Sequence, residues 1–67
     1  MITLIRFNSD GQEFALNCEL IETIDQTPDT LITLTSGKKI LVDESMDEIV
    51  RKVMEYRRTI YGSRGLR

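Results

Sequence analysis

The sequence predicts a mostly β fold of the α+β class, in which a five-stranded antiparallel β-meander is followed by one C-terminal amphipathic α-helix packed on the sheet. Three observations predict it. Short β-prone runs alternate with turn-forming residues, a helix-capping pattern follows them, and the apolar residues beyond that pattern recur at the helical period. A chain of 67 residues has room for one domain. We assign this domain to residues 1–61 and expect residues 62–67 to form a flexible tail.

Turn-forming residues separate the predicted strands. Asn8–Gly11 forms a short polar loop, Pro28 presets φ in another loop, and Gly37 permits a tight hairpin connection. Because such short joints connect antiparallel neighbours, the strands should follow one another as a meander. The predicted strands are residues 2–7, 12–17, 20–25, 30–35 and 38–43.

The predicted helix begins after Ser45. Ser45 and Glu48 have the spacing of a capping box, in which the two side chains bond each other's backbone N–H groups. Beyond them the apolar residues fill one arc of roughly 160°, at about 100° per residue. Arg57 is the one charged residue inside that arc, and Gly62 should end the helix.

Period-two alternation sorts the strand residues onto two faces. One face is apolar and could be covered by the helix, whereas the other mixes threonines with apolar side chains. This mixture favours a self-association face and a homo-oligomer. The alternative is that the strands coil into a small barrel lined by the same face. The covered face collects Ile2, Leu4, Phe14, Leu16, Leu20, Ile24, Ile32, Leu34, Ile40 and Val42, and the predicted self-association face is Ile5, Phe7, Ile21, Leu31 and Leu41.

The composition argues against catalysis. The chain has no histidine and one cysteine, so it lacks the commonest general base and cannot form an internal disulfide. Cys18 suits a small buried filler. The carboxylates of Asp43, Glu44, Asp47 and Glu48 fall where a strand ends and a helix begins, which favours a structural role. We therefore predict no enzyme, no catalytic residues, no metal and no cofactor.

Charge is divided along the chain. Residues 1–50 carry three basic and ten acidic residues, a net charge of −7, whereas residues 51–67 carry six basic and one acidic residue, a net charge of +5. A basic end favours an anionic contact, although cations also suit the C-terminal end of a helix. The strands carry too few cations to favour nucleic acid. The sequence has neither a signal peptide nor an apolar run of about 18 residues, so we expect a cytoplasmic protein without membrane insertion.

Several segments of the chain together form a distinctive sequence pattern. The most specific part of it is Thr27-Pro28-Asp29-Thr30 joined to Ile32-Thr33-Leu34-Thr35-x-Gly37-Lys38-Lys39. With this pattern, the chain up to about Tyr61 resembles the FlbD/SwrD family of small bacterial flagellar proteins. The first loop, at residues 9–12, is longer than the family pattern. The other matching segments are Ile2-x-Leu4-x-Arg6-Phe7-Asn8, Glu13-Phe14-x-Leu16-Asn17, Leu20-Ile21-Glu22-x-Ile24, Glu44-Ser45-x-Asp47-Glu48 and Tyr56-Arg57-Arg58.

The resemblance implies a non-enzymatic accessory protein of flagellar motility and swarming. It implies support of stator function at the cytoplasmic side of the basal body, with flagellar motor or basal-body proteins as partners. A function of another class stays open, a small nucleic-acid-binding regulator of flagellar gene expression. Salt-dependent gel shifts distinguish the two, because binding to a polyanion weakens steeply as salt rises.

Arg57 is the first candidate for partner binding, because it breaks the apolar pattern of the helix. Tyr56 and Arg58 add the aromatic and guanidinium groups that are common in interface anchors. The alternative is that the helix overruns the sheet and Arg57 only extends its charged end to water. Arg6 and Asn8 match the family pattern at the end of a strand and are further candidates, with backbone bonding at a turn as their alternative.

Overall fold

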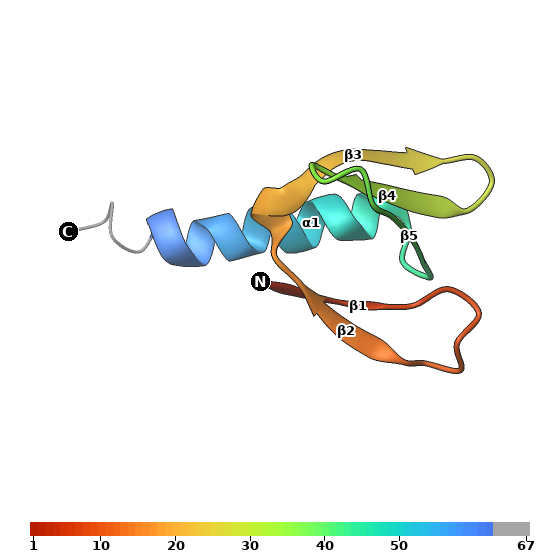
Figure 1. The fold of residues 1–67 in the computed structure, drawn as a ribbon. Coiled ribbons are helices and arrows are strands. Elements are labelled where there is room, and N and C mark those ends of the chain that lie inside the picture. Colours follow the sequence, from red (N-terminus) through yellow and green to blue (C-terminus); the bar gives the residue numbers. More distant parts are fainter. Residues whose placement is uncertain (63–67) are drawn as a thin grey trace.

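The fold contains the predicted strands and helix in the predicted order (Figure 1). The computed structural model describes residues 1–62, so the predicted tail lies outside the described residues apart from Gly62. A 3-10 turn, η1 (Cys18–Leu20), precedes the third strand, and a π-helical turn, η2 (Arg58–Gly62), follows the helix. The remaining elements are β1 (Ile2–Ile5), β2 (Glu13–Leu16), β3 (Ile21–Gln26), β4 (Thr30–Leu34), β5 (Lys39–Val42) and α1 (Met46–Arg57).

The five antiparallel strands form two sheets, β1-β2 and β3-β4-β5. The sequence did not predict this division, which arises because η1 turns the chain between β2 and β3. The two sheets meet instead where β1 ends beside β5. There the N–H of Phe7 donates to the Leu41 carbonyl at 3.1 Å, and the N–H of Asp43 donates to the Ile5 carbonyl at 2.9 Å. The spatial order is therefore β2-β1-β5-β4-β3, with β2 and β3 at the two margins.

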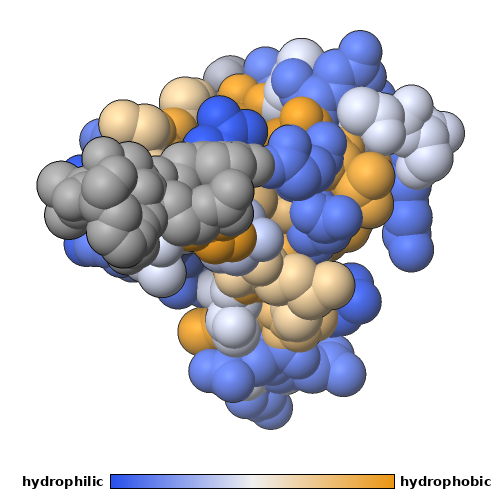
Figure 2. All heavy atoms as spheres, turned by 90° about the vertical axis from the view of Figure 1, so that its left-hand side faces the viewer, coloured by the Kyte–Doolittle hydropathy of each residue, from blue (hydrophilic) through white to orange (hydrophobic). Residues whose placement is uncertain are grey.

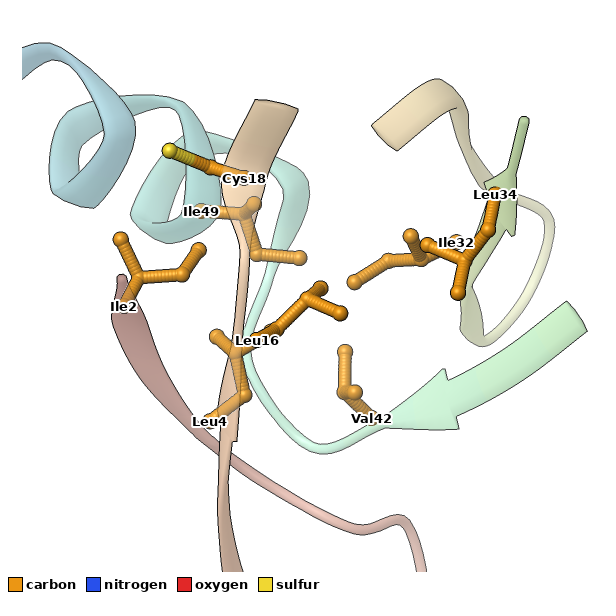
Figure 3. Packing of buried hydrophobic residues seen from close by; sticks show 8 residues of the cluster. All are labelled: Ile2, Leu4, Leu16, Cys18, Ile32, Leu34, Val42 and Ile49. Atoms are coloured by element: carbon orange, nitrogen blue, oxygen red, sulfur yellow. The ribbon is translucent and has the colours of Figure 1, made fainter. Parts of the chain in front are cut away.

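The core lies between the two sheets and α1 (Figure 3). Leu4 of β1, Ile32 of β4 and Val42 of β5 are buried almost completely, and Ile49 of α1 closes the space between them with no exposed surface. Lys52 fastens the same helix to β1 by donating from its Nζ to the Thr3 carbonyl at 3.0 Å. The buried hydrophobic residues are Ile2, Leu4, Leu16, Cys18, Ile32, Leu34, Val42 and Ile49.

Two residues at the junction of η1 and β3 lie elsewhere than the alternation predicted. Leu20 is 45% exposed because it belongs to η1, where the period of a strand does not apply. Ile21 is half-buried against the core, so the prediction that it lies on the outer face is wrong. A β-bulge between Ile21 and Thr23 is the reason, since one extra residue moves the side chain before it to the opposite face.

The start of α1 is capped as predicted and also tied to β3. Ser45 Oγ accepts from the Glu48 N–H at 3.2 Å, and a Glu48 carboxylate oxygen accepts from the Ser45 N–H at 3.1 Å. The Gln26 side-chain oxygen, at the end of β3, accepts from the Met46 N–H. The helix then runs back past β3 in the opposite direction and continues beyond the strands (Figure 1).

α1 buries a narrower stripe than its apolar arc. Ile49 is fully buried, and Val53 and Tyr56 are half-buried against the core. Val50 and Met54, in the same predicted arc, are 46% and 58% exposed. The helix sits in the opening between two small sheets, which leaves one side of its apolar arc uncovered.

Glu44 holds the junction between β1 and the segment after β5. Its two carboxylate oxygens each accept from the Ile5 N–H at 3.1 Å, and the residue is only 8% exposed. The structural role predicted for this carboxylate therefore has a specific form. It satisfies a backbone donor of β1 that the ladder leaves without a strand partner.

Replacing Glu44 should destabilise the fold more than replacing an exposed acidic residue. Glu44→Ala removes a charged acceptor and leaves the Ile5 N–H without a partner, at a cost of about 1–3 kcal/mol in the free energy of unfolding. Glu55→Ala, at an exposed position of α1, should change it by less than about 0.5 kcal/mol. Urea unfolding measures both, and equal midpoints for the two variants would contradict this role of Glu44.

Candidate functional site

Two hollows flank α1, one on each side of the helix. The hollow beside β1, of about 350 Å³, has a mixed lining in which Thr3, Lys52, Glu55 and Thr59 supply polar groups. The hollow beside β3, of about 170 Å³, is lined within the described part of the chain by apolar side chains and one cation. We call the second the β3–α1 groove. It is lined by Cys18, Ile21, Ile24, Val50, Val53, Met54 and Arg57.

The β3–α1 groove lies between β3 and the side of α1 that the strands leave uncovered. Gln26 holds the start of α1 against the end of β3, whereas the later turns of α1 project past the strands. Ile21 and Ile24 form the sheet side of the groove, and Val50 and Met54 form its exposed helix side. An apolar surface that stays open beside a sheet is suited to contact another polypeptide.

Arg57 lies at the rim of this groove. It is the last residue of α1, and it is exposed. Among the residues that the structure describes, it is the one charged residue of the lining. The helix does overrun the strands, as the alternative interpretation of Arg57 required. Because Arg57 is exposed and shares the lining with apolar side chains, its stem can pack against them while its guanidinium stays in water, where a partner can meet it.

The predicted trio at the end of α1 divides between the two sides of the helix. Tyr56 is half-buried against the core and lines the hollow beside β1, not the β3–α1 groove. Arg58 is exposed at the start of η2 and lines neither hollow. Neighbours in sequence lie about 100° apart on a helix, so Tyr56 and Arg57 point to different surfaces. The structure thus brings Arg57, and not Tyr56, to the groove.

Arg6 and Asn8 belong to the segment that joins β1 to β2. That segment lies away from the projecting end of α1 (Figure 1). The Arg6 guanidinium stands over the Phe14 ring, 4.6 Å from its centroid. The backbone N–H of Arg6 donates to the Gln12 carbonyl at 2.9 Å. Asn8 occupies a turn with φ of +57°, a left-handed conformation that asparagine adopts more readily than most residues. Both positions therefore have local structural roles.

The predicted self-association face persists on the outer surface without Ile21. Leu31 pairs directly with Leu41 across β4 and β5, and the Leu41 carbonyl accepts from the Phe7 N–H. Phe7 and Leu41 are more than 40% exposed, and Ile5 and Leu31 are partly exposed. We call Ile5, Phe7, Leu31 and Leu41 the outer sheet patch.

The two apolar surfaces are separate, since one borders α1 and the other lies on the opposite side of the sheet. Hydrophobic surface next to strongly hydrophilic side chains is also visible in Figure 2, which looks toward the C-terminal end of α1.

A sequence model that describes flagellar and swarming motility proteins, FlbD, matches residues 1–61. The chain belongs to the FlbD family. No curated protein and no solved structure matches it.

In this FlbD-family chain, the thiol of Cys18 and the carboxylates of Glu44 and Glu48 have structural roles. Cys18 is a buried free thiol in the core, as predicted, and Glu44 and Glu48 bond backbone N–H groups. Within residues 1–62, no three His, Cys, Asp or Glu side chains are grouped so that they could hold a metal ion. In the same part of the chain, no helix is long and apolar enough to cross a membrane.

Sequence reasoning missed Ile24, Val50 and Met54 as groove residues of the FlbD-family chain. Their pattern predicted burial, which depends on how much of the helix the strands cover. A signal was present, because an apolar arc of roughly 160° is wider than the stripe of about 100° that a core-facing surface helix requires. The excess width corresponds to the side that the β3–α1 groove leaves open.

Replacing Phe7 tests whether copies of the chain associate through the outer sheet patch. We expect wild-type protein to sediment as an oligomer at micromolar concentration and Phe7→Asp to sediment as a monomer, because a charge cannot be buried unpaired in an apolar contact. Leu20→Asp is the matched control, since Leu20 is 45% exposed but lies outside the patch. A folded wild-type monomer under these conditions would contradict the prediction.

Proposed function

We propose that this FlbD-family chain supports the flagellar motor by promoting stator function through protein–protein contacts, without catalysing a reaction. Membership of the family establishes a role in flagellar or swarming motility. The proposal adds the motor as the place of action, at the cytoplasmic side of the basal body. It also makes a stator or basal-body protein the partner.

The position of Arg57 carries the proposal. Interface anchors are commonly arginine or aromatic side chains in apolar surroundings that exclude water. Arg57 has such surroundings, because Val53 and Met54 lie in the same lining and Ile21 forms the facing wall. A partner that covers the groove would desolvate this guanidinium and would have to supply an acidic group to it.

The expected partner segment is therefore apolar with an acidic residue at the end that meets Arg57. Arg58 lies next in sequence and adds a second exposed cation at this end of the helix. Arginine binds a carboxylate through two parallel N–H donors, which fixes the orientation of a partner as well as attracting it. An acidic cytoplasmic segment of the motor has the required chemistry.

A nucleic-acid-binding function is less well supported by the same surface. Glu22 and Asp25 are exposed on β3, the strand that borders the groove, and their carboxylates would repel a phosphate backbone that approached this strand. Phosphate contacts need several lysines or arginines on one face. The cations at the end of α1 stand next to an acidic strand, which favours a protein segment of mixed charge over a polyanion.

Reversing the charge of Arg57 should abolish motility support. Arg57→Glu places a carboxylate where the partner's acidic group must lie, and like charges in a desolvated contact repel strongly. Swarming of cells that carry the variant measures the effect. Circular dichroism of the purified variant should be unchanged, because Arg57 is exposed at the end of α1.

Lys38→Glu provides the control, because it changes the net charge equally in an exposed turn between β4 and β5. That variant should swarm as wild type does. Arg57→Glu should also fail to pull down cytoplasmic motor components, whereas Lys38→Glu should pull them down as wild type does. Normal swarming of a folded Arg57→Glu variant would reject the proposal, and a salt-sensitive shift of nucleic acid by the wild-type protein would favour the regulator instead.

A further inference from the structure

β3 has an unpaired edge. It lies at the end of the order β3-β4-β5, and in Figure 1 it forms the upper margin of the molecule. Among residues 1–62, β4 is the one strand that pairs with it. An unpaired strand edge presents backbone N–H and C=O groups that can bind another extended segment.

The backbone groups of Ile24 face this open edge. In an antiparallel ladder, successive residues of a strand bond alternately to the neighbours on its two sides. Since the Leu34 N–H donates to Lys38 at 2.8 Å, the even-numbered residues of β4 bond to β5 and the odd-numbered residues bond to β3. Thr23 and Asp25 are the β3 partners of odd-numbered β4 residues, which leaves the N–H and C=O of Ile24 directed outward.

The side chain of the same residue lines the β3–α1 groove. A strand that pairs with β3 at Ile24 would therefore place its own side chain at that position over the groove, because directly opposed residues share one face. That side chain would cover Val50 and Met54, the two most exposed apolar residues in the groove lining. Hydrogen bonding at the edge and burial in the groove thus require the same segment.

Charge defines the chemistry of that segment. β3 and α1 run in opposite directions, so Arg57 lies at the Ile21 end of the groove and Gln26 at the other. An added antiparallel strand would bring its C-terminal end toward Arg57. We call the residue of the added strand that lies opposite Ile24 its central residue. The residue just before the central one would lie opposite Asp25 on the outer face, and Asp25 is exposed and acidic.

We propose that the β3–α1 groove binds an extended partner segment that adds to β3 as an antiparallel strand. The segment has a basic residue before a central apolar residue and an acidic residue on the C-terminal side. The inference deepens the proposed function, since it rests on the same groove and states the conformation and charge pattern of what binds there. Pairing of backbone groups supplies affinity, and the groove with its flanking charges supplies specificity.

Selection from a random peptide library on the purified chain tests the charge pattern. Dodecapeptides displayed on phage and selected on immobilised wild-type protein should show the basic–apolar–acidic order. Selection on Arg57→Glu should replace the C-terminal acidic residue by a basic one. A synthetic peptide of the wild-type consensus should bind Arg57→Glu about tenfold more weakly, and Lys38→Glu as tightly as wild type. The proposal would be overturned if peptides were enriched on the wild-type protein no more than on Met54→Asp. It would also be overturned if wild type and Arg57→Glu selected the same consensus.

Amide hydrogen exchange of the complex with that peptide tests strand addition directly. The Ile24 amide should become at least about tenfold more protected, since it gains a hydrogen-bond partner. The Asp25 amide should change less, because it already faces β4. A peptide that binds without protecting Ile24 would overturn strand addition, as would a wild-type dimer that Met54→Asp dissociates.

The two tests separate this inference from the proposed function. If swarming requires Arg57 while no bound peptide protects Ile24, the motor contact stands and strand addition is wrong. If the selected peptide pairs with β3 while Arg57→Glu cells swarm normally, the binding mode stands and the role assigned to the groove in the motor is wrong.

Discussion

Burial of one helix against two small sheets is the constraint on which this fold depends. A two-stranded sheet is marginal on its own, and the backbone of β1-β2 is bonded to the other sheet where β1 ends beside β5. Ile49 of α1 fills the space that both sheets border, and Gln26 and Lys52 hold the helix to β3 and β1. The helix therefore joins the two sheets as well as covering them.

The same constraint produces the surface that we assign to binding. Because α1 lies between the two sheets, it contacts strands on two sides. Neither sheet covers the whole of its apolar arc. Val50 and Met54 stay exposed as a result, next to Ile24 of β3, whose outer edge pairs with no strand within residues 1–62. Incomplete coverage of α1 and an unfilled edge of β3 are two consequences of one arrangement, and together they form a site for an extended segment.

Charges in this chain divide by position between the fold and the surface. At the start of α1, the carboxylates of Glu44 and Glu48 satisfy backbone donors and are occupied by the structure. At its other end, Arg57 is exposed beside apolar side chains. A cation at the C-terminal end of a helix also interacts favourably with the helix dipole. Arg57 can therefore stabilise α1 while its guanidinium stays exposed.

The sequence by itself determined the local features of this protein. The strand positions, the Ser45–Glu48 capping box and the resemblance to the flagellar family depend on neighbours a few residues apart, and each is confirmed. The tertiary structure decided what depends on distant residues. Examples are the division into two sheets, the bond from Ile5 to Glu44, 39 residues away, and the exposure of one side of α1. Periodicity specifies which side chains share a face, but how far another element covers that face depends on contacts that close only when the whole chain has folded.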